Sequence, residues 1–287
     1  MHTVIMEGKN LADKIIHNLK DRIKNLHEKH KITPKLVTIL VGYDSASKIY
    51  INSKTKKCAA VGILTDNIFL EDTIDEGALL NKINELNNDK TIHGILVQLP
   101  LPKKFDTLKI LSAVSPDKDV DGFHPANLGN LLYGKAAFVP CTPLGIMELL
   151  KEYKISVEGK NAVVLGRSNI VGKPISILLL NENATVTICH SKTKDLKEHT
   201  LQADILISAI GKPNFVTADM VKQGACVIDV GINRIDGKVT GDVDFENVKN
   251  KASYITPVPG GVGLLTIAML LSNTILAAVS ANKQGNT

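Results

Sequence analysis

Aliphatic and β-branched runs alternate with amphipathic helical patterns along the chain, and this alternation constrains the fold more than any other sequence feature. Buried strands are expected at 35–42, 92–102, 161–166, 184–189, 203–211 and 225–232. Helices are expected at 10–30, from Asp44 or Ser45 to about residue 60, from Pro143, from Lys173 and at 264–279. Strands that alternate with helices predict largely parallel sheets, so the expected fold class is α/β.

The alternation comes in two series that join near residues 140–155, and 287 residues are enough for two domains. We predict a first α/β domain over 1–140 and a second, Rossmann-like domain over 141–263, with a cleft between them. The C-terminal helix, 264–287, is expected to pack back on the first domain.

Composition narrows the class of function. A net charge of +5 raises the possibility of a nucleic-acid partner. The lysines are spread along the chain, however, and aromatic residues make up only 4% with no Trp, so both a basic stripe and a stacking platform are missing. A mildly basic enzyme with small anionic ligands fits better.

No signal pattern and no apolar run of membrane-spanning length is seen, so a cytoplasmic protein without a membrane partner is expected. The four cysteines are isolated and are expected to be buried free thiols in a reducing compartment. His27 and His30 lack a third ligand, so no metal site is predicted.

The run VVLGRSNIVGKP, residues 163–174, reads as a strand, a turn and a helix. Backbone N–H groups of the turn and the helix N-terminus could cradle a pyrophosphate between Gly166 and Gly172. Ser168 replaces the second glycine of the usual dinucleotide fingerprint, so a plain turn explains this motif alone equally well.

The segment CHSKTK, 189–194, follows the next strand, where an acid would select NAD by binding its ribose hydroxyl. No acid occurs there before Asp195, while Ser191 and the cationic Arg167 suit a 2′-phosphate. NADP is therefore favoured, and NAD stays open.

Tyr50 and Lys54 are four residues apart on the helix after the first strand and share one face. Surface decoration is the usual explanation of such a pair. At the carboxyl end of a parallel strand, however, a desolvated lysine could act as a base, and the aromatic ring could stack on a planar substrate. Gln98 ends a strand, where its amide could orient a lysine or a ligand.

Two further runs are open to a structural or a functional interpretation. DVDGFHPANL, from Asp119, could be a polar turn or the floor of a site. TPVPGGVG, 256–263, could be a flexible turn, but its prolines favour a backbone wall against a ligand.

Nine motifs taken in order resemble the bifunctional methylenetetrahydrofolate dehydrogenase/cyclohydrolases. They are VGYDSASKIYINSKTKKCAAVGI, QLPLP, DVDGF, PCTP, GRSNIVGKP, HSKT, DVGIN, GDVDF and TPVPGGVG. The resemblance covers nearly the whole chain. One departure is Leu264-Leu265-Thr266, where the family usually has Pro-Met-Thr, which removes some pre-organisation of the first helical turn.

The resemblance implies oxidation of 5,10-methylenetetrahydrofolate by NADP⁺, hydrolysis of the methenyl product to 10-formyltetrahydrofolate, and a homodimer. It also implies roles in purine, methionine and histidine biosynthesis. Asp121 would bind the pterin ring, which leaves Asp119 as a loop acid. The implied catalytic residues are Tyr50, Lys54, Gln98 and Asp121. The folate would also contact Val97, Leu99, Pro259, Gly260 and Gly261. The cofactor would contact Gly166, Arg167, Ser168, Gly172, Ser191 and Ile232.

Two alternatives remain. One is an enzyme with the dehydrogenase activity alone, possibly linked to NAD, and Lys54 and the CHSKTK segment oppose it. The other is a non-catalytic dinucleotide-binding module, which would leave the polar residues of the first domain without a purpose.

Overall fold

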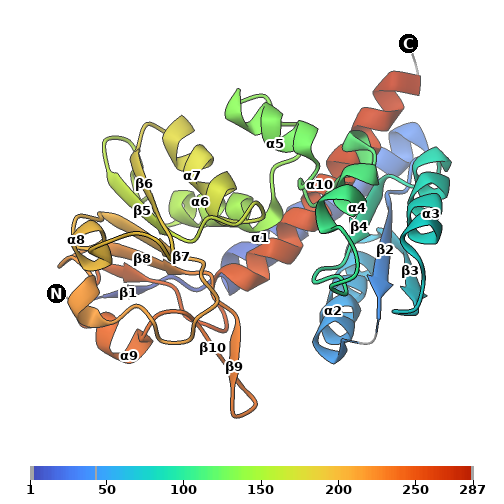
Figure 1. Ribbon diagram of the computed structural model, residues 1–287. Helices are drawn as coiled ribbons and strands as arrows, with labels where there is room; N and C mark the ends of the chain where they lie inside the picture. Colours follow the sequence, from blue (N-terminus) through green and yellow to red (C-terminus); the bar gives the residue numbers. More distant parts are fainter. Residues whose placement is uncertain (1–2, 43, 286–287) are drawn as a thin grey trace. The chain divides into compact units, whose positions relative to one another are not determined.

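The computed structural model describes residues 3–42 and 44–285, and its chain divides into two compact units (Figure 1). Unit 1 comprises residues up to Asp13, 131–135 and 140–266, and unit 2 comprises 14–130, 136–139 and residues from Ile267 on. Both are α/β units with parallel sheets, which confirms the predicted fold class.

Unit 2 contains a three-stranded parallel sheet in the order β3-β2-β4. Its strands are β2 (Lys35–Val41), β3 (Leu64–Leu70) and β4 (Gly94–Val97). Its helices include most of α1 (Lys9–His30) and α10 (Val262–Gly285), together with α2 (Ser45–Val61), α3 (Glu76–Asn88), α4 (Thr107–Ala113), η1 (Pro116–Lys118) and α5 (Pro125–Leu132).

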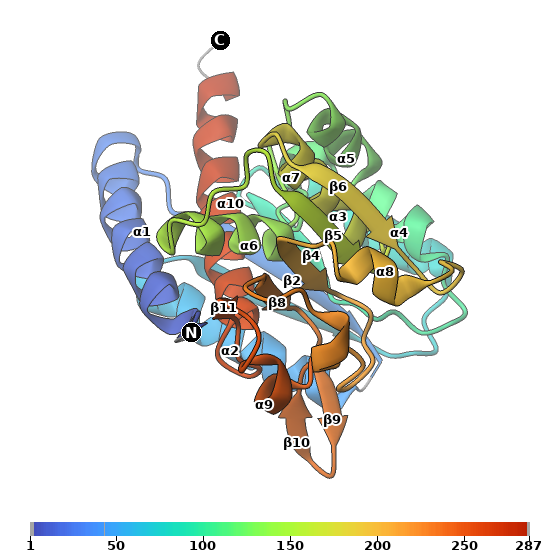
Figure 2. The ribbon, with the colours of Figure 1, turned by 90° about the vertical axis from the view of Figure 1, so that its left-hand side faces the viewer.

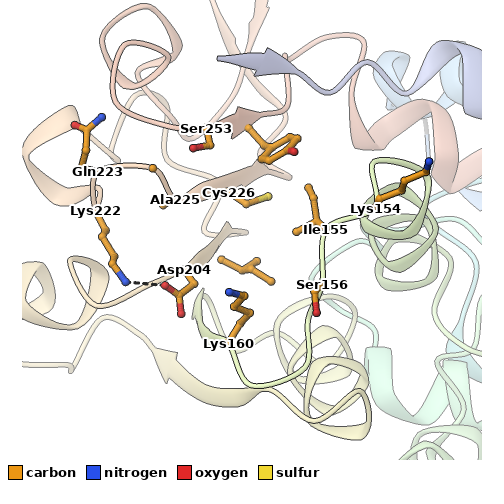
Figure 3. Close-up of a pocket in the computed structure, with 13 residues that line it drawn as sticks. Lys154, Ile155, Ser156, Lys160, Asp204, Lys222, Gln223, Ala225, Cys226 and Ser253 are labelled. Atoms are coloured by element: carbon orange, nitrogen blue, oxygen red, sulfur yellow. Dashed lines mark hydrogen bonds and ion pairs between the residues drawn. The ribbon is translucent and has the colours of Figure 1, made fainter. Parts of the chain in front are cut away.

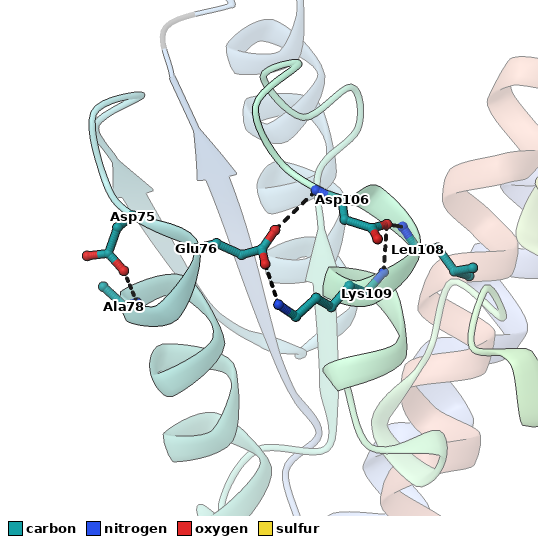
Figure 4. A network of polar contacts seen from close by, with 6 residues as sticks. All are labelled: Asp75, Glu76, Ala78, Asp106, Leu108 and Lys109. Atoms are coloured by element: carbon teal, nitrogen blue, oxygen red, sulfur yellow. Dashed lines mark hydrogen bonds and ion pairs between the residues drawn. The ribbon is translucent and has the colours of Figure 1, made fainter.

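Alternation along β2 sends Val37, Ile39 and Val41 to the face of the sheet that packs with Leu79 and Ile83 of α3. Glu76 ties the starts of α3 and α4 together, because its carboxylate accepts hydrogen bonds from Lys109 Nζ and the Asp106 amide (Figure 4). β3 escaped the sequence analysis because it is an edge strand of mixed polarity with no apolar run.

Unit 1 contains a six-stranded parallel sheet in the order β1-β11-β8-β7-β5-β6. Its strands β11, β8, β5 and β6 are labelled in Figure 2. The strands are β1 (Val4–Ile5), β5 (Asn161–Leu165), β6 (Thr185–Cys189), β7 (Ile205–Ser208), β8 (Cys226–Asp229) and β11 (Tyr254–Ile255). β9 (Asn233–Ile235) and β10 (Lys238–Thr240) form an antiparallel hairpin. The helices lying wholly in this unit are α6 (Cys141–Glu152), α7 (Gly172–Asn181), α8 (Leu196–Thr200), η2 (Ala218–Met220) and α9 (Phe245–Val248).

The N-terminal segment differs from the predicted boundary, which placed every residue up to 140 in the first domain. β1 pairs with β11, so this segment joins the sheet of unit 1. A two-residue strand carries no periodicity, and only its pairing assigns it. At the other end of the chain, Asn273 of α10 donates to the carbonyls of Val120 and Val139 within unit 2. Residues 286 and 287 of the predicted helix lie outside the described residues.

α10 also corrects the prediction that no apolar run is long enough to cross a membrane. Val262–Lys283 passes that test by length and by a mean hydropathy of 2.1. Two-thirds of its most apolar stretch (67%) is buried inside the protein, as in the core helix of a soluble protein, so the helix is weak evidence for a membrane span.

Candidate functional site

Lys54 is buried in unit 2, with 6% of its surface exposed. Its Nζ donates to Gln98 Oε1 over 3.0 Å and lies 4.3 Å from the centre of the Tyr50 ring. Gln98 in turn donates from Nε2 to the Leu99 carbonyl over 2.7 Å, which fixes the amide so that its oxygen faces the lysine. The structure therefore brings together the three side chains that the sequence singled out, and the lysine is not surface decoration.

The local fold accounts for this meeting. Gly42 turns the chain after β2 with φ of +85°, and the Asp44 side chain caps α2 by accepting the Ser47 amide. Gln98 directly follows β4, and its backbone N–H donates to the carbonyl of Ile39 in β2. The side chains of Lys54 and Gln98 thus meet at the carboxyl edge of the parallel sheet, where α/β proteins bind ligands.

Asp119 is not a simple loop acid, as the sequence suggested, because its side chain is buried. It accepts hydrogen bonds from the amides of Phe123 and His124 and from Asn127 Nδ2, over 2.8–3.1 Å. Burial raises the pKa of its carboxyl above the ordinary value, whereas these bonds oppose the rise. Asp119 therefore shapes the loop.

The half-buried Asp121 lies within the loop that Asp119 shapes. The backbone of Asp119 also forms an isolated parallel β-bridge with Ile95 of β4, so the loop lies beside the strand that precedes Gln98. Asn273 holds the preceding residue, Val120, by its carbonyl. Asp119 and Asn273, which the sequence analysis gave no role in the site, thus set the position of Asp121.

All four cysteines are free and buried, as predicted. Burial raises the pKa of the Cys58 and Cys226 thiols to about 12, so both stay protonated at neutral pH. No group of three or more potential His, Cys, Asp or Glu metal ligands occurs among the described residues. Neither a thiolate nor a bound metal is therefore assigned to the site.

In unit 1, the glycine turn follows β5, the strand that lies between β6 and β7. This is the point where the strand order reverses, at which open α/β sheets bind dinucleotides. Gly166 has φ of +113°, and a Cβ there would lie 2.4 Å from the Ala209 carbonyl oxygen. A Cβ on Gly172 would lie 2.3 Å from the Gly166 oxygen, so both positions require glycine.

Ser168 closes this turn in place of the missing glycine. Its Oγ accepts the amides of Val171 and Gly172 over 3.1 and 3.2 Å, at the start of α7. Those two helix donors are therefore already used, contrary to the expectation that they would face a pyrophosphate. The hydroxyl keeps its own hydrogen, which can be donated to a phosphate oxygen.

The segment after β6 forms a compact turn, since the His190 amide donates to Thr193 Oγ1 and the Lys192 amide to His190 Nδ1. Ser191 is exposed there, and Arg167 is exposed in the turn after the neighbouring strand β5. The carboxyl ends of the adjacent strands β5 and β6 thus present the guanidinium of Arg167 and the hydroxyl of Ser191, a donor set that fits a phosphate ester.

The PGGVG segment packs tightly on the N-terminal segment. The Gly8 amide donates to the Gly260 carbonyl over 2.8 Å, and a Cβ on Gly8 would lie 2.2 Å from the Gly261 oxygen. At the departure from Pro-Met-Thr, Leu264, which stands in place of the proline, is half-buried. Leu265, which stands in place of the methionine, is fully buried against Gly145. Ile232, by contrast, is 69% exposed, an unusual state for a large aliphatic side chain.

Two buried carboxylates, Asp229 and Asp242, complete this edge of unit 1. Sequence analysis cited their motifs, DVGIN and GDVDF, without giving either acid a role. Asp229 accepts the amides of Gly231, Asp242 and Val243, and Asp242 accepts those of residues 210–212. The signal that could have found them is an acid beside a glycine at the end of a strand.

A cavity of about 360 Å³ opens elsewhere in unit 1, at the amino ends of β5, β7 and β8 (Figure 3). Lys222 and Asp204 form an ion pair at its rim over 2.6 Å. None of the predicted site residues lines it. Parallel sheets bind ligands at their other edge, so the polar residues described above define the candidate site better than this cavity does.

Comparison with known proteins shows the family of the chain. Residues 6–121 match the family model for the tetrahydrofolate dehydrogenase/cyclohydrolase catalytic domain, and 140–282 match its NAD(P)-binding domain. The bifunctional protein FolD of Sulfurihydrogenibium sp. (strain YO3AOP1) is 58% identical, covering 95% of this chain and 96% of its own.

Two solved structures are also similar. The bifunctional methylenetetrahydrofolate dehydrogenase/cyclohydrolase of Campylobacter jejuni is 52% identical with a TM-score of 0.95, covering 97% of this chain and 99% of its own. The Trypanosoma brucei enzyme, complexed with NADP and an inhibitor, is 38% identical with a TM-score of 0.94, covering 98% of both chains.

Proposed function

Because the chain belongs to the tetrahydrofolate dehydrogenase/cyclohydrolase family, we propose that it catalyses two successive reactions of one-carbon folates. It oxidises 5,10-methylenetetrahydrofolate to 5,10-methenyltetrahydrofolate with NADP⁺, and it hydrolyses that product to 10-formyltetrahydrofolate. The observation that carries this function is the buried Lys54 hydrogen-bonded to Gln98 in a chain that matches both domains of the family.

NADP supplies a hydride acceptor when bound. In this chain Gly166 and Gly172 let the turn after β5 close tightly against Ala209 and against itself, which shapes the turn for the dinucleotide. Ser168 can donate its hydroxyl hydrogen to a phosphate oxygen. Arg167 and Ser191 suit the 2′-phosphate, since one is a fixed cation and the other a hydroxyl donor. Ile232 offers an apolar surface to the nicotinamide ring.

Lys54 serves the hydrolysis. Water adds to the methenyl carbon and loses a proton to the amine as it attacks. The bond from that carbon to N5 then breaks, as the new hydroxyl loses its proton to give the formyl carbonyl and N5 takes up a proton. Only the neutral amine of Lys54 can take the proton, so the proposed role requires that form of the side chain. Gln98 orients the amine without adding charge, and the Tyr50 ring lies beside it to stack on the folate.

The folate is held from several loops. Asp121 presents two oxygens to the paired N–H donors of the pterin. Val97 and Leu99 flank Gln98 at the same edge of the sheet of unit 2. In unit 1, Pro259, Gly260 and Gly261 keep the proposed role of a backbone wall against a ligand. The hydride step requires mainly that these contacts orient the substrate.

The protein acts as a homodimer, which the exposed edge of unit 1 supports. β6 is the outermost strand, with no described strand paired to its outer edge, and Ile188 on it is 40% exposed. An unpaired apolar edge is a surface on which a second copy can add its own strand. We expect sedimentation to give a dimer, and Ile188→Lys to give a monomer.

The reactions take place in the cytoplasm, without nucleic-acid or membrane partners. Their product is a one-carbon donor of the kind used in purine, methionine and histidine biosynthesis. The scattered lysines and the low aromatic content support the absence of a nucleic-acid partner.

One assay tests the proposed function against its alternatives. NADPH absorbance should appear when methylenetetrahydrofolate and NADP⁺ are supplied, and supplied methenyltetrahydrofolate should decay faster than it does without enzyme. Dehydrogenase activity alone, or a preference for NAD⁺, would favour a monofunctional enzyme. The absence of both reactions, with NADP⁺ still bound, would favour a binding module.

A further inference from the structure

Asp242, between β10 and α9, is fully buried in unit 1 and accepts hydrogen bonds from one loop and two strands, β7 and β9. Its Oδ2 accepts three of them and its Oδ1 accepts two. The donors are Ser208 Oγ (3.2 Å), Ile210 N (2.8 Å), Gly211 N (3.2 Å), Lys212 N (2.9 Å) and Asn233 Nδ2 (3.0 Å).

Asp229 holds Asp242 in place from the end of β8. Its Oδ1 accepts the amides of Gly231 and Asp242 over 3.0 and 2.9 Å, and its Oδ2 accepts that of Val243 over 2.9 Å. Its own amide donates to Thr256 Oγ1 over 2.7 Å, which connects the pair to the strand that precedes PGGVG.

The two acids and two glycines fit together with no spare space. A Cβ on Gly231 would lie 2.1 Å from Asp242 Oδ1, and a Cβ on Gly241 would lie 1.8 Å from Asp229 Oδ2. Neither carboxylate forms an ion pair with any described residue, and the donors are backbone amides, a hydroxyl and an amide side chain. Burying such charges is costly, so a gain other than stability is expected.

That gain is the position of the loops that border the dinucleotide turn. Residues 210–212, anchored on Asp242, directly follow Ala209, whose oxygen limits the space at Gly166. The exposed Ile232 lies between Gly231, held by Asp229, and Asn233, held by Asp242. The acid pair therefore fixes the loops after both β7 and β8.

We propose that Asp242, supported by Asp229, is a positioning residue for the cofactor, and that it sets NADP affinity without taking part in the folate chemistry. This inference rests on the proposed function, since hydrolysis of methenyltetrahydrofolate needs no NADP. Damage to the acid pair should therefore separate cofactor affinity from hydrolysis.

The test is Asp242→Asn, which keeps the shape of the side chain but has one acceptor oxygen. The amide can serve only one of the two sets of donors, and its NH₂ group would face the other. We expect the Kd of NADP⁺ in calorimetry and its KM to rise roughly ten- to a hundredfold. The rate on supplied methenyltetrahydrofolate should stay within about twofold of the parent's rate.

Asp219→Asn is the matched control, because this exposed acid of the same unit pairs with Lys197 outside the cofactor loops. If Asp242→Asn does not fold, Asn233→Ala keeps both acids and releases only the loop that carries Ile232. A several-fold weaker NADP⁺ affinity is then expected, again with hydrolysis retained.

Unchanged NADP⁺ affinity in a folded variant would overturn the inference. So would an equal loss of both activities together with a lower Tm, since the acids would then only support the fold. A parent protein that binds NADP⁺ but hydrolyses no methenyltetrahydrofolate would count against the proposed function, while calorimetry would still test the inference.

Discussion

Replacing Lys54 by Met should separate the two reactions of the proposed function. Met has nearly the length of the lysine stem and fits the same buried space, but it has no amine. The hydride step should survive, because departure of the hydride leaves a cation that the adjacent nitrogens of the folate stabilise. The hydrolysis should not, because the attacking water then has no base.

The size of the effect follows from the contacts of Lys54. General bases contribute about 10²–10⁴-fold, so hydrolysis should fall to near the uncatalysed rate. Loss of the 3.0 Å hydrogen bond from the neutral amine to Gln98 costs about 0.5–1.5 kcal/mol, and the retained Gln98–Leu99 bond limits any rearrangement. A volume-conserving change in this site should cost less than about 1.5 kcal/mol in folding free energy.

Two absorbance assays separate the steps. One follows methenyltetrahydrofolate after NADP⁺ is added to the methylene compound, and the other follows the decay of supplied methenyltetrahydrofolate. In the first, the variant should accumulate the intermediate that the parent consumes. Lys56→Met is the matched control, since Lys56 is exposed on the same helix and its loss should change neither rate.

Lys54→Arg distinguishes a base from a positioning group. Arginine keeps a cation near Gln98 but does not deprotonate in proteins, so it too should lose hydrolysis. If Lys54→Met hydrolyses the methenyl compound at the parent's rate, the proton acceptor lies elsewhere. If only Lys54→Arg retains the rate, the charge of Lys54 matters rather than its basicity.

Three further predictions concern the other acids and the cofactor. Asp121→Ala should lower folate affinity roughly ten- to a hundredfold and reduce both activities together; equal folate binding in calorimetry would contradict this. Replacing Arg167 and Ser191 by Ala should raise the KM for NADP⁺ far more than that for NAD⁺, and equal rises would assign these residues elsewhere. Burial raises the pKa of Asp229 from 3.8 to about 6, with the nearby Asp242 adding to the rise. Its contribution to stability is therefore full below about pH 3.8 and is lost as pH rises to about 6. Urea unfolding gives the free energy of unfolding of the parent and of Asp229→Asn, and the parent's value minus the variant's should fall by up to about 3 kcal/mol across that pH range. A difference that does not change with pH would refute the shift.

The sequence predicts most of the fold because the buried strands of parallel sheets are continuous apolar runs. The runs at 35–42 and 161–166 match β2 and β5, and the helix expected at 10–30 matches α1. Among the elements it missed, α3 has a local signal in its Asp75 cap and in Leu79, Ile83 and Leu86, whereas β1 and β3 owe their place to long-range contacts. β1 exists only through its pairing with β11, and β3 is an edge strand whose polar residues hide its alternation.

The same division applies to the candidate site. Spacing alone places Tyr50 and Lys54 on one helical face, and the ends of two strands bring Gln98 to Lys54. No local pattern shows that Ser168 uses up two helix donors, or that Asn273 holds the loop before Asp121 from 153 residues away. Such roles depend on partners that only the folded chain brings near.

The buried acids share a rule that extends what sequence can predict. Asp229 ends β8, Asp242 comes two residues after β10, and Asp119 forms an isolated bridge with Ile95 of β4. Each of the three accepts backbone amides. A parallel sheet ends in loops whose amides have no strand partner, and a buried carboxylate can gather several of them at once. The donors must come close, which favours a nearby glycine such as Gly122, Gly231 or Gly241. Asp121 differs because it is only half-buried within a loop already shaped by another acid, and the proposed function assigns its carboxylate to the pterin.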